Sequence, residues 1–401
     1  MPPSPPPTAP VTQAVHAGRD DLQAEGVHAP PLDLSTTYPF RDLTTAGDSL
    51  NALAHGAAEA DEPIYARLHN PTVARCEDAV AELEGAPHCI AFGSGMAAVT
   101  ASLLAAGMDS RHVVAVRPCY GTTDHLLSTG LLGIDVTWTT PDTIGDAIQD
   151  DTALVIVETP ANPTLQLVDL EAAAEQAGSV PMLVDSTFAP PVLQRPLDHG
   201  AALSLHSATK FLGGHGDVVG GVVSTDDADW AQRLRQVRVM TGALLHPMAA
   251  YLLHRSLPTL PARVERAQAT AQTLADRLAA HSALSTVHYP GRRDSDLLGP
   301  QMSGPGTMIS FDVGDAETAR GLLQRTDVIT PAVSLGAVDS LLQHPASLTH
   351  GVVDAEAREQ NGITPGLLRL SVGLEDAEDL WHDLSTALDA TTQTETVPCE
   401  G

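Results

Sequence analysis

Lysine is nearly absent from this chain of 401 residues. Of its 21 basic residues, 20 are arginine, and the one lysine is Lys210. A reaction that needs a primary amine on a side chain therefore has a single candidate. Acidic residues number 50, which gives a formal net charge of −29. Because this charge repels phosphate backbones and anionic lipids, we expect neither nucleic acid nor a membrane surface as a partner.

Cysteines and long apolar runs are also scarce. The four cysteines form no CxxC pair, and we expect no disulfide framework and no metal site. No apolar run approaches the roughly 18 residues of a membrane span. Residues 1–7 have neither a cationic flank nor a hydrophobic core, so they do not resemble a secretory signal. We therefore expect a cytoplasmic protein.

Hydrophobic residues make up 43% of the chain, enough for two or three packed domains. Residues 1–10 are typical of a disordered, proline-rich tail, and residues 11–63 of an N-terminal arm without sustained helical period. Over residues 64–256, short β-branched runs alternate with helical stretches, which predicts an α/β domain with a mainly parallel sheet. Residues 257–401 are expected to form a C-terminal α+β domain.

Local signals predict individual elements of these domains. Asn70 and Pro71 indicate the start of a helix that Gly85 ends, and a second helix is expected from Gly95 to Gly107. A long amphipathic helix starts near residue 257, and its apolar face holds Val264, Ala267, Ala271, Leu274, Ala275 and Leu278. The predicted strands are His112–Val116, Asp135–Thr139, Ala153–Glu158, Pro181–Asp185, Leu203–His206 and Val218–Ser224.

Lys210 lies just after the last residue of a predicted strand, with the hydroxyls of Ser207 and Thr209 nearby. This placement suits a Schiff base, although an ordinary surface lysine fits the same pattern. Asp185 ends another predicted strand, where it either faces the ligand crevice of an open α/β sheet or caps a helix. A carboxylate there would keep the ring nitrogen of pyridoxal phosphate (PLP) protonated.

The segment Gly93–Ala98 leads into the second predicted helix. Its backbone N–H groups and the positive end of the helix favour a bound phosphate. The segment lacks the GK[ST] ending of a P-loop, which argues against nucleoside triphosphates. A strand-GxGxxG-helix unit with a distal acid is also missing, so a dinucleotide enzyme is not supported.

Seven motifs follow one another along the chain: Gly93–Ala98, Glu158–Pro163, Asp185–Thr187, Ser207–Lys210, Ser334–Gly336, His344–His350 and Arg369–Asp376. Together they resemble the Cys/Met-metabolism family of PLP enzymes, which includes cystathionine γ-synthase, cystathionine γ-lyase and methionine γ-lyase. The resemblance runs from about residue 11 to residue 388. It implies a PLP-dependent transferase fold of the aspartate-aminotransferase-like type (fold type I), with an extended N-terminal arm that contacts a neighbouring subunit.

The resemblance implies a role for each matching residue that meets the cofactor. Lys210 would carry PLP as a Schiff base and move protons, Tyr120 would stack on the ring as the second catalytic residue, and Asp185 would pair with the pyridine nitrogen. Tyr65 and Arg67 would reach the phosphate bound by the neighbouring subunit. The remaining phosphate contacts would come from Gly95, Met96, Ser207 and Thr209.

For the substrate, the resemblance implies that Arg369 clamps the carboxylate of a small amino acid, helped by Ser334 and Asn162, with Tyr65 close by. It also implies a homotetramer, a dimer of dimers whose active sites are shared between subunits.

Several positions depart from the cystathionine-handling members of the family. Val333 replaces a glutamate, Ile64 replaces an acidic residue, and His125 replaces an arginine. A pocket without these polar groups should reject the distal half of cystathionine. Val333 resembles methionine γ-lyases, yet Thr122 stands where those enzymes carry a cysteine.

We therefore expect PLP-dependent γ-elimination on a small amino acid with a compact or apolar γ-substituent, such as methionine, homocysteine or a γ-halogenated amino acid. Three alternatives stay open. They are a γ-replacement synthase of the cystathionine γ-synthase or O-acylhomoserine sulfhydrylase type, a cystathionine γ-lyase, and a binding protein that has lost catalysis.

Overall fold

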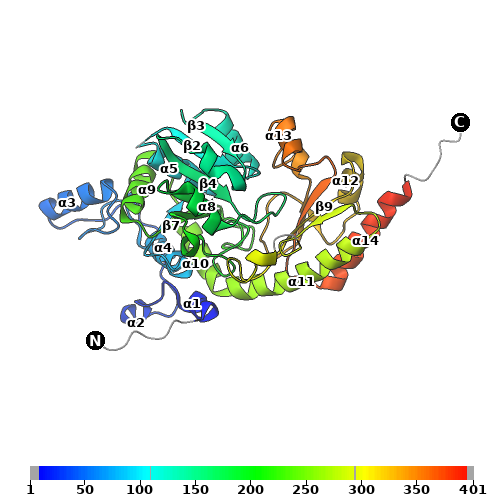
Figure 1. The fold of residues 1–401 in the computed structure, drawn as a ribbon. Helices are drawn as coiled ribbons and strands as arrows, with labels where there is room; N and C mark the ends of the chain where they lie inside the picture. Colours follow the sequence, from blue (N-terminus) through cyan, green and yellow to red (C-terminus); the bar gives the residue numbers. More distant parts are fainter. Residues whose placement is uncertain (1–8, 109, 293–294, 395–401) are drawn as a thin grey trace. The chain divides into compact units, whose positions relative to one another are not determined.

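The computed structural model describes residues 9–108, 110–292 and 295–394, and the first eight residues of the predicted tail lie outside this part. Figure 1 shows the helices and strands of the chain, coloured along the sequence. The chain forms two compact units. The first unit joins Met1–Met108 to Ala202–Ala262, and the second joins Asp109–Ala201 to Arg263–Gly401. The domain boundaries expected after residues 63 and 256 stay a prediction.

In the first unit, strands run antiparallel in the order β1 (His88–Phe92), β7 (Gly221–Thr225) and β6 (Leu203–His206). The strand β1 is missing from the predicted set because it is short and begins with a histidine and a cysteine rather than a β-branched run. The helices that contact these strands are α4 (Pro71–Glu84), α5 (Gly95–Ala106) and α9 (Ala228–Thr241). Helix α10 (Pro247–Ser256) packs on α4.

The ends of α4 follow the sequence signals. Asn70 Oδ1 accepts hydrogen bonds from the backbone N–H groups of Thr72 (3.0 Å) and Val73 (3.1 Å), and Pro71 is the first helical residue. Gly85 ends the helix with a φ of 71°, a left-handed conformation that favours glycine. The predicted helix boundaries are therefore confirmed here.

The N-terminal arm holds more helix than expected. It contains α1 (Pro10–His16), α2 (Leu22–Glu25) and the twelve-residue α3 (Leu43–Ala54). The expectation of no sustained helix is wrong for α3, which starts at an N-cap where Asp42 Oδ1 accepts a hydrogen bond from the backbone N–H of Thr45 at 2.8 Å. Its apolar period is weak, because Leu43 and Leu50 are exposed while Ala46 and Leu53 are buried.

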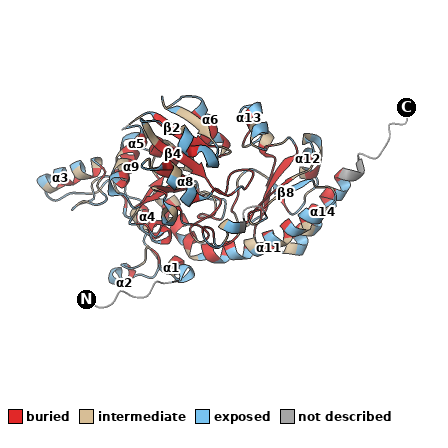
Figure 2. Cartoon of the chain, in the orientation of Figure 1, coloured by how far each residue is buried: buried red, intermediate tan, exposed pale blue. Residues whose placement is uncertain are grey.

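The second unit contains parallel strands in the order β5 (Met182–Asp185), β4 (Thr152–Glu158), β2 (His112–Val116) and β3 (Asp135–Thr139). Valines of β2, β4 and β5 lie in a buried core, in agreement with the predicted parallel sheet (Figure 2). Its helices are α6 (Gly121–Ser128), α7 (Ile144–Ala147) and α8 (Leu170–Ala177).

A second sheet in this unit has the order β10 (Thr330–Pro331), β11 (Leu341–Gln343), β12 (Leu367–Ser371), β9 (Met308–Asp312) and β8 (Thr286–His288). Its core includes side chains of α11 (Leu260–Ala280), α12 (Ala316–Leu323) and α14 (Ala377–Thr394). Every residue of the predicted apolar face of α11 is buried. A short helix, α13, spans Ala355–Gln360.

None of the described helices is long and apolar enough to cross a membrane.

Candidate active site

The predicted phosphate-binding residues of the first unit meet at the start of α5. A Cβ atom on Gly95 would lie 2.9 Å from the Ser207 Cβ and 3.0 Å from its Oγ, so the helix start and the hydroxyl-bearing loop after β6 adjoin closely. Ser94 Oγ caps the helix by accepting a hydrogen bond from the N–H of Ala97 at 3.0 Å. The Ser207 hydroxyl thus lies beside the backbone at the positive, N-terminal end of the twelve-residue helix α5. A hydroxyl and backbone N–H groups together form a set of donors that fits a phosphate.

Thr209 fastens this loop to the segment that leads into β7. Its Oγ1 accepts a hydrogen bond from the N–H of Gly220 at 3.1 Å and lies 3.2 Å from the Gly220 carbonyl oxygen, to which it donates. Thr209 and Lys210 are both partly buried, so the loop is a fixed feature of the unit rather than an exposed tip. This burial argues against the alternative that Lys210 is an ordinary surface lysine.

A buried pair at the end of β6 supports the same loop. His206 Nε2 lies 2.6 Å from Glu84 Oε1, and both side chains are almost inaccessible to solvent. Glu84 is the last residue of α4, so the pair anchors the strand that precedes Lys210 to a helix. The sequence analysis missed Glu84, because nothing local distinguishes it from a solvated glutamate at a helix end.

Tyr65 and Arg67 lie together on the surface of the first unit. The Arg67 guanidinium is 5.6 Å from the centroid of the Tyr65 ring, and Arg67 Nη1 donates to the Val239 carbonyl at 3.0 Å. Tyr65 is 43% exposed. Both side chains are therefore within reach of another molecule.

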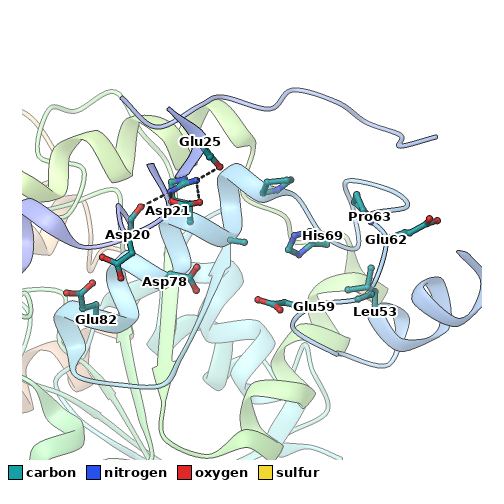
Figure 3. Close-up of a pocket in the computed structure, with 15 residues that line it drawn as sticks. Asp20, Asp21, Glu25, Leu53, Glu59, Glu62, Pro63, His69, Asp78 and Glu82 are labelled. Carbon is teal, nitrogen blue, oxygen red and sulfur yellow. Dashed lines mark hydrogen bonds and ion pairs between the residues drawn. The ribbon is translucent and has the colours of Figure 1, made fainter. Parts of the chain in front are cut away.

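A cavity of about 720 Å³ in the first unit has seven acidic side chains in its lining and none of the predicted site residues. Arg75, on its wall, pairs with Asp21 and Glu25 (Figure 3). A phosphate would be repelled by such a lining, so this cavity is not a candidate cofactor site. The other acidic side chains of the lining are Asp20, Glu59, Glu62, Asp78 and Glu82.

In the second unit, Asp185 ends β5 and lies in register with Glu158, which ends β4. Asp185 Oδ1 accepts hydrogen bonds from the Thr187 N–H at 3.0 Å and the Thr187 hydroxyl at 2.5 Å. The alternative that Asp185 caps a helix is wrong, since the next helical turn along the chain begins at Pro196. Two carboxylates therefore lie side by side at the C-terminal edge of the parallel strands, where α/β sheets bind ligands.

Glu158 is a site residue to which the sequence analysis gave no role. Its Oε2 accepts a hydrogen bond from the N–H of Tyr120 at 2.7 Å, and its Oε1 accepts one from the N–H of Asn162 at 3.0 Å. Burial and the neighbouring charge of Asp185 raise its pKa well above the usual range, while these hydrogen bonds and Arg369 act in the opposite direction.

Arg369 is almost fully buried at 2% exposure, and its partners are neutral. Nη1 donates to Asn162 Oδ1 at 2.8 Å, and Nη2 donates to the Ser334 carbonyl at 3.0 Å. Burial lowers the pKa of Arg369 to about 10, so the side chain stays cationic at neutral pH. Within the described part of the chain, no carboxylate forms an ion pair with it. Ser334 itself has a φ of 92°, a strained conformation for a residue with a side chain.

The predicted substrate-carboxylate residues Asn162, Ser334 and Arg369 are thus brought together. A buried, hydrogen-bonded guanidinium without a charged partner is suited to bind a carboxylate ligand.

The model of the Cys/Met metabolism PLP-dependent enzyme family matches residues 11–389. The chain belongs to this family. It is 57% identical over 388 residues to an L-methionine gamma-lyase of Brevibacterium sandarakinum, a match that covers 95% of this chain and 98% of that one. Its identity with an L-methionine gamma-lyase of Streptomyces avermitilis is 56%, over 94% of this chain and 88% of the relative.

A crystal structure of cystathionine gamma synthase from Xanthomonas oryzae pv. oryzae in complex with cystathionine superposes with a TM-score of 0.88 and 36% identity, over 97% of this chain and 100% of the other. The predicted fold class, fold type I, and the PLP cofactor are therefore confirmed, and so is the prediction of a PLP-dependent γ-lyase. The alternative of a binding protein that has lost catalysis is not supported.

The positions at which this family member departs from cystathionine-handling relatives are accessible. Val333, next to Ser334, is 51% exposed. Thr122 and His125 are exposed on one face of α6, one turn apart and directly after Tyr120. Ile64 precedes Tyr65, and its carbonyl accepts a hydrogen bond from the N–H of Tyr38 at 3.2 Å. These four positions can vary without disturbing a packed core.

Proposed function

We propose that this enzyme is a γ-lyase that acts on L-methionine or a compact analogue of it. With methionine and water, the products are methanethiol, 2-oxobutanoate and ammonia. The similarity to L-methionine gamma-lyases over nearly the whole chain supports this substrate.

The observation that carries the proposal is the buried Arg369. Its guanidinium donates hydrogen bonds to neutral oxygen acceptors, including Asn162 Oδ1 at 2.8 Å. The α-carboxylate of an amino acid supplies the missing negative charge and two oxygens in the geometry of a guanidinium fork. Asn162 and Ser334 then orient Arg369 toward that carboxylate.

We assign the PLP contacts by residue. Lys210 would hold the cofactor covalently through Nζ, Tyr120 would contact its ring, and the Asp185 carboxylate would pair with the ring nitrogen. The start of α5 at Gly95 and Met96, with the hydroxyls of the Ser207–Lys210 loop, would receive the phosphate. When bound, PLP supplies an electron sink for carbanions at the substrate carbons.

We also propose that Lys210 moves the protons. With PLP and substrate bound, Nζ would take a proton from Cα and then one from Cβ, which would allow the sulfur substituent on Cγ to leave. Tyr120 would hold the cofactor ring in place.

In this proposal, the absence of a charge at Val333 explains the preference for methionine over cystathionine. A valine beside Ser334 offers no charge to the distal ammonium group of cystathionine, whereas a methyl thioether needs none. In this proposal, Val333 forms one wall of the substrate pocket, and Thr122 and His125 form the other.

We also propose a homotetramer in the cytoplasm, with Tyr65 and Arg67 directed to the phosphate site of a neighbouring subunit. Their exposure in the isolated chain supports this arrangement.

The test is mass spectrometry of products from the PLP-loaded enzyme, mixed with methionine, homocysteine, cystathionine, O-acetylhomoserine and γ-chlorinated amino acids, each with and without an added thiol. We expect 2-oxobutanoate and ammonia from methionine without thiol, and little turnover of cystathionine. New amino acids that form only with thiol would instead establish a γ-replacement synthase, the alternative that the similarity to cystathionine gamma synthase favours.

A further inference from the structure

Two buried side chains hold both polar groups of the peptide unit that carries Tyr120. The N–H of Tyr120 donates to Glu158 Oε2 at 2.7 Å. The carbonyl of Cys119, which belongs to the same peptide unit, accepts a hydrogen bond from His350 Nε2 at 3.1 Å. The plane of this peptide unit is therefore fixed from both sides.

The same two side chains also hold the backbone of Asn162, here through two successive peptide units. Its N–H donates to Glu158 Oε1 at 3.0 Å, and its carbonyl accepts from His350 Nε2 at 3.1 Å. Glu158 thus accepts an N–H from each of the two loops, and His350 shares one N–H between a carbonyl of each loop. These four contacts tie the loop after β2 to the loop after β4.

The chemistry of each group suits this arrangement. Both partners of His350 Nε2 are carbonyl oxygens, so the proton of the neutral ring lies on Nε2. His350 is 1% exposed, and its segment lies directly against the start of α6, since a Cβ on Gly121 would be 2.1 Å from the Thr349 carbonyl oxygen. Each oxygen of Glu158 accepts a backbone N–H, the pattern that a carboxylate prefers.

We propose that Glu158 and His350 are positioning residues that fix Tyr120 and Asn162 relative to each other. The roles of these two rest on the proposed function, in which Tyr120 contacts the cofactor ring and Asn162 orients Arg369 toward the substrate carboxylate. Loosening either positioning residue then weakens cofactor binding and substrate binding together. A defect confined to Tyr120 or to Asn162 would weaken one of them.

The test compares His350→Leu, which removes the N–H donor, with His350→Gln, whose Nε2 occupies a similar place and keeps it. The matched control is His344→Leu. His344 is also buried and also bonds a backbone carbonyl, that of Pro365 at 2.6 Å, and its other hydrogen bond goes to the Ser347 hydroxyl at 2.8 Å rather than to Tyr120 or Asn162. Glu158→Gln, of equal size, replaces one acceptor by a donor and tests the other half of the clamp.

We expect His350→Leu to raise both the dissociation constant of PLP from the apoenzyme and the KM for methionine by about 10- to 100-fold, because it leaves two buried carbonyls unpaired. Hydrogen exchange should accelerate at the amides of Tyr120 and Asn162. His350→Gln should restore both constants to within about 3-fold, and Glu158→Gln should raise both by about 10-fold.

The inference is overturned if His350→Leu behaves like His344→Leu, with a lower melting temperature but unchanged PLP affinity, KM and exchange rates. If His350→Leu does not fold, Glu158→Gln and His350→Gln provide the test. A normal PLP dissociation constant, a normal KM and normal amide exchange in Glu158→Gln would then overturn the inference. Absence of γ-lyase activity in the unmodified enzyme would sink the proposed function alone. PLP affinity and amide exchange would still decide whether Glu158 and His350 fix the two loops.

Discussion

Arg369 Nη1 donates a 2.8 Å hydrogen bond to Asn162 Oδ1 across 207 positions of sequence. The acceptor is neutral, so it orients the guanidinium without cancelling its charge. Each of the two residues is almost fully buried. The contact therefore holds the guanidinium in one orientation before an anionic ligand binds. A cation held in this way binds an anion more effectively than a flexible charged side chain on the surface.

Arg369→Lys tests this preparation. A lysine keeps the charge but loses the planar fork and the bond geometry to Asn162, so we expect the KM for methionine to rise about 100-fold with a smaller change in kcat. Steady-state kinetics measure both constants. Arg292→Lys, at an exposed arginine that pairs with Asp276 at 3.1 Å, should leave them unchanged. An equal KM in the two variants would contradict carboxylate binding by Arg369.

Lys210→Arg tests the covalent attachment of PLP, and the composition of the chain means that no other lysine side chain can be labelled. Because Lys210 is the only lysine, borohydride reduction of the PLP-loaded enzyme should label one side chain in each subunit. Mass spectrometry of the digest should place the label at residue 210 and find none in Lys210→Arg. Label that persists in the variant, on the N-terminal amine for example, would rule out Lys210 as the attachment point.

Much of the site was predictable from sequence because its signals are local. Lys210 follows a short apolar strand, Asp185 ends another, and Gly95 starts a helix whose N-cap can be recognised in the sequence. Ligands often bind at the ends of strands and at the N-termini of helices, so these local patterns identify the three residues. The helix α3 escaped prediction because its apolar period is weak.

Glu158 and His350 escaped for a different reason. Their partners are backbone groups, and the bonds of His350 reach across 231 and 188 positions of sequence. Backbone N–H and carbonyl groups leave no trace in a sequence pattern, so a glutamate or histidine that binds them looks like any other. The Glu84–His206 pair, 122 positions apart, was hidden in the same way.

Gly95→Ala should weaken cofactor binding. The added Cβ would lie 2.9 Å from the Ser207 Cβ, closer than carbon atoms tolerate, so the helix start and the loop must separate. We expect the PLP dissociation constant of the apoenzyme to rise by about 10-fold or more, measured by fluorescence titration.

The control for this change is Gly47→Ala in α3, where an added Cβ meets nothing within 4 Å. Helix propensity predicts that this variant is slightly stabilised and binds PLP normally. Equal PLP affinities in the two variants would show that the close approach at Gly95 has no role in phosphate binding.

Val333→Glu should shift specificity toward cystathionine. A carboxylate beside Ser334 can pair with the distal ammonium group, and we expect the ratio of kcat/KM for cystathionine to that for methionine to rise about 10-fold or more. Val333→Gln separates charge from size and should change the ratio less. If the two variants give the same ratio, charge at position 333 does not select the substrate.

The buried histidine His350 should make the enzyme sensitive to acid. Burial, together with the positive charge of Arg369, lowers the pKa of His350 from 6.5 to about 4, although the hydrogen bonds to the Cys119 and Asn162 carbonyls and the negative charge of Asp124 act in the opposite direction. The unfolded chain then binds more protons than the folded one between these values. The stability contributed by the neutral ring is therefore complete above pH 6.5 and is lost as the pH falls toward 4. The loss between pH 7 and pH 5 should be about 2 kcal/mol.

Glutamine at this position keeps the hydrogen-bond donor but cannot take up a proton, so His350→Gln should lose that much less stability over the same range. Thermal unfolding of both proteins at pH 7 and pH 5 measures the difference, and every other titrating group acts equally in the two. Parallel losses in the two proteins would mean that His350 takes up its proton at the same pH in the folded enzyme as in the unfolded chain, so burial would not keep the ring neutral.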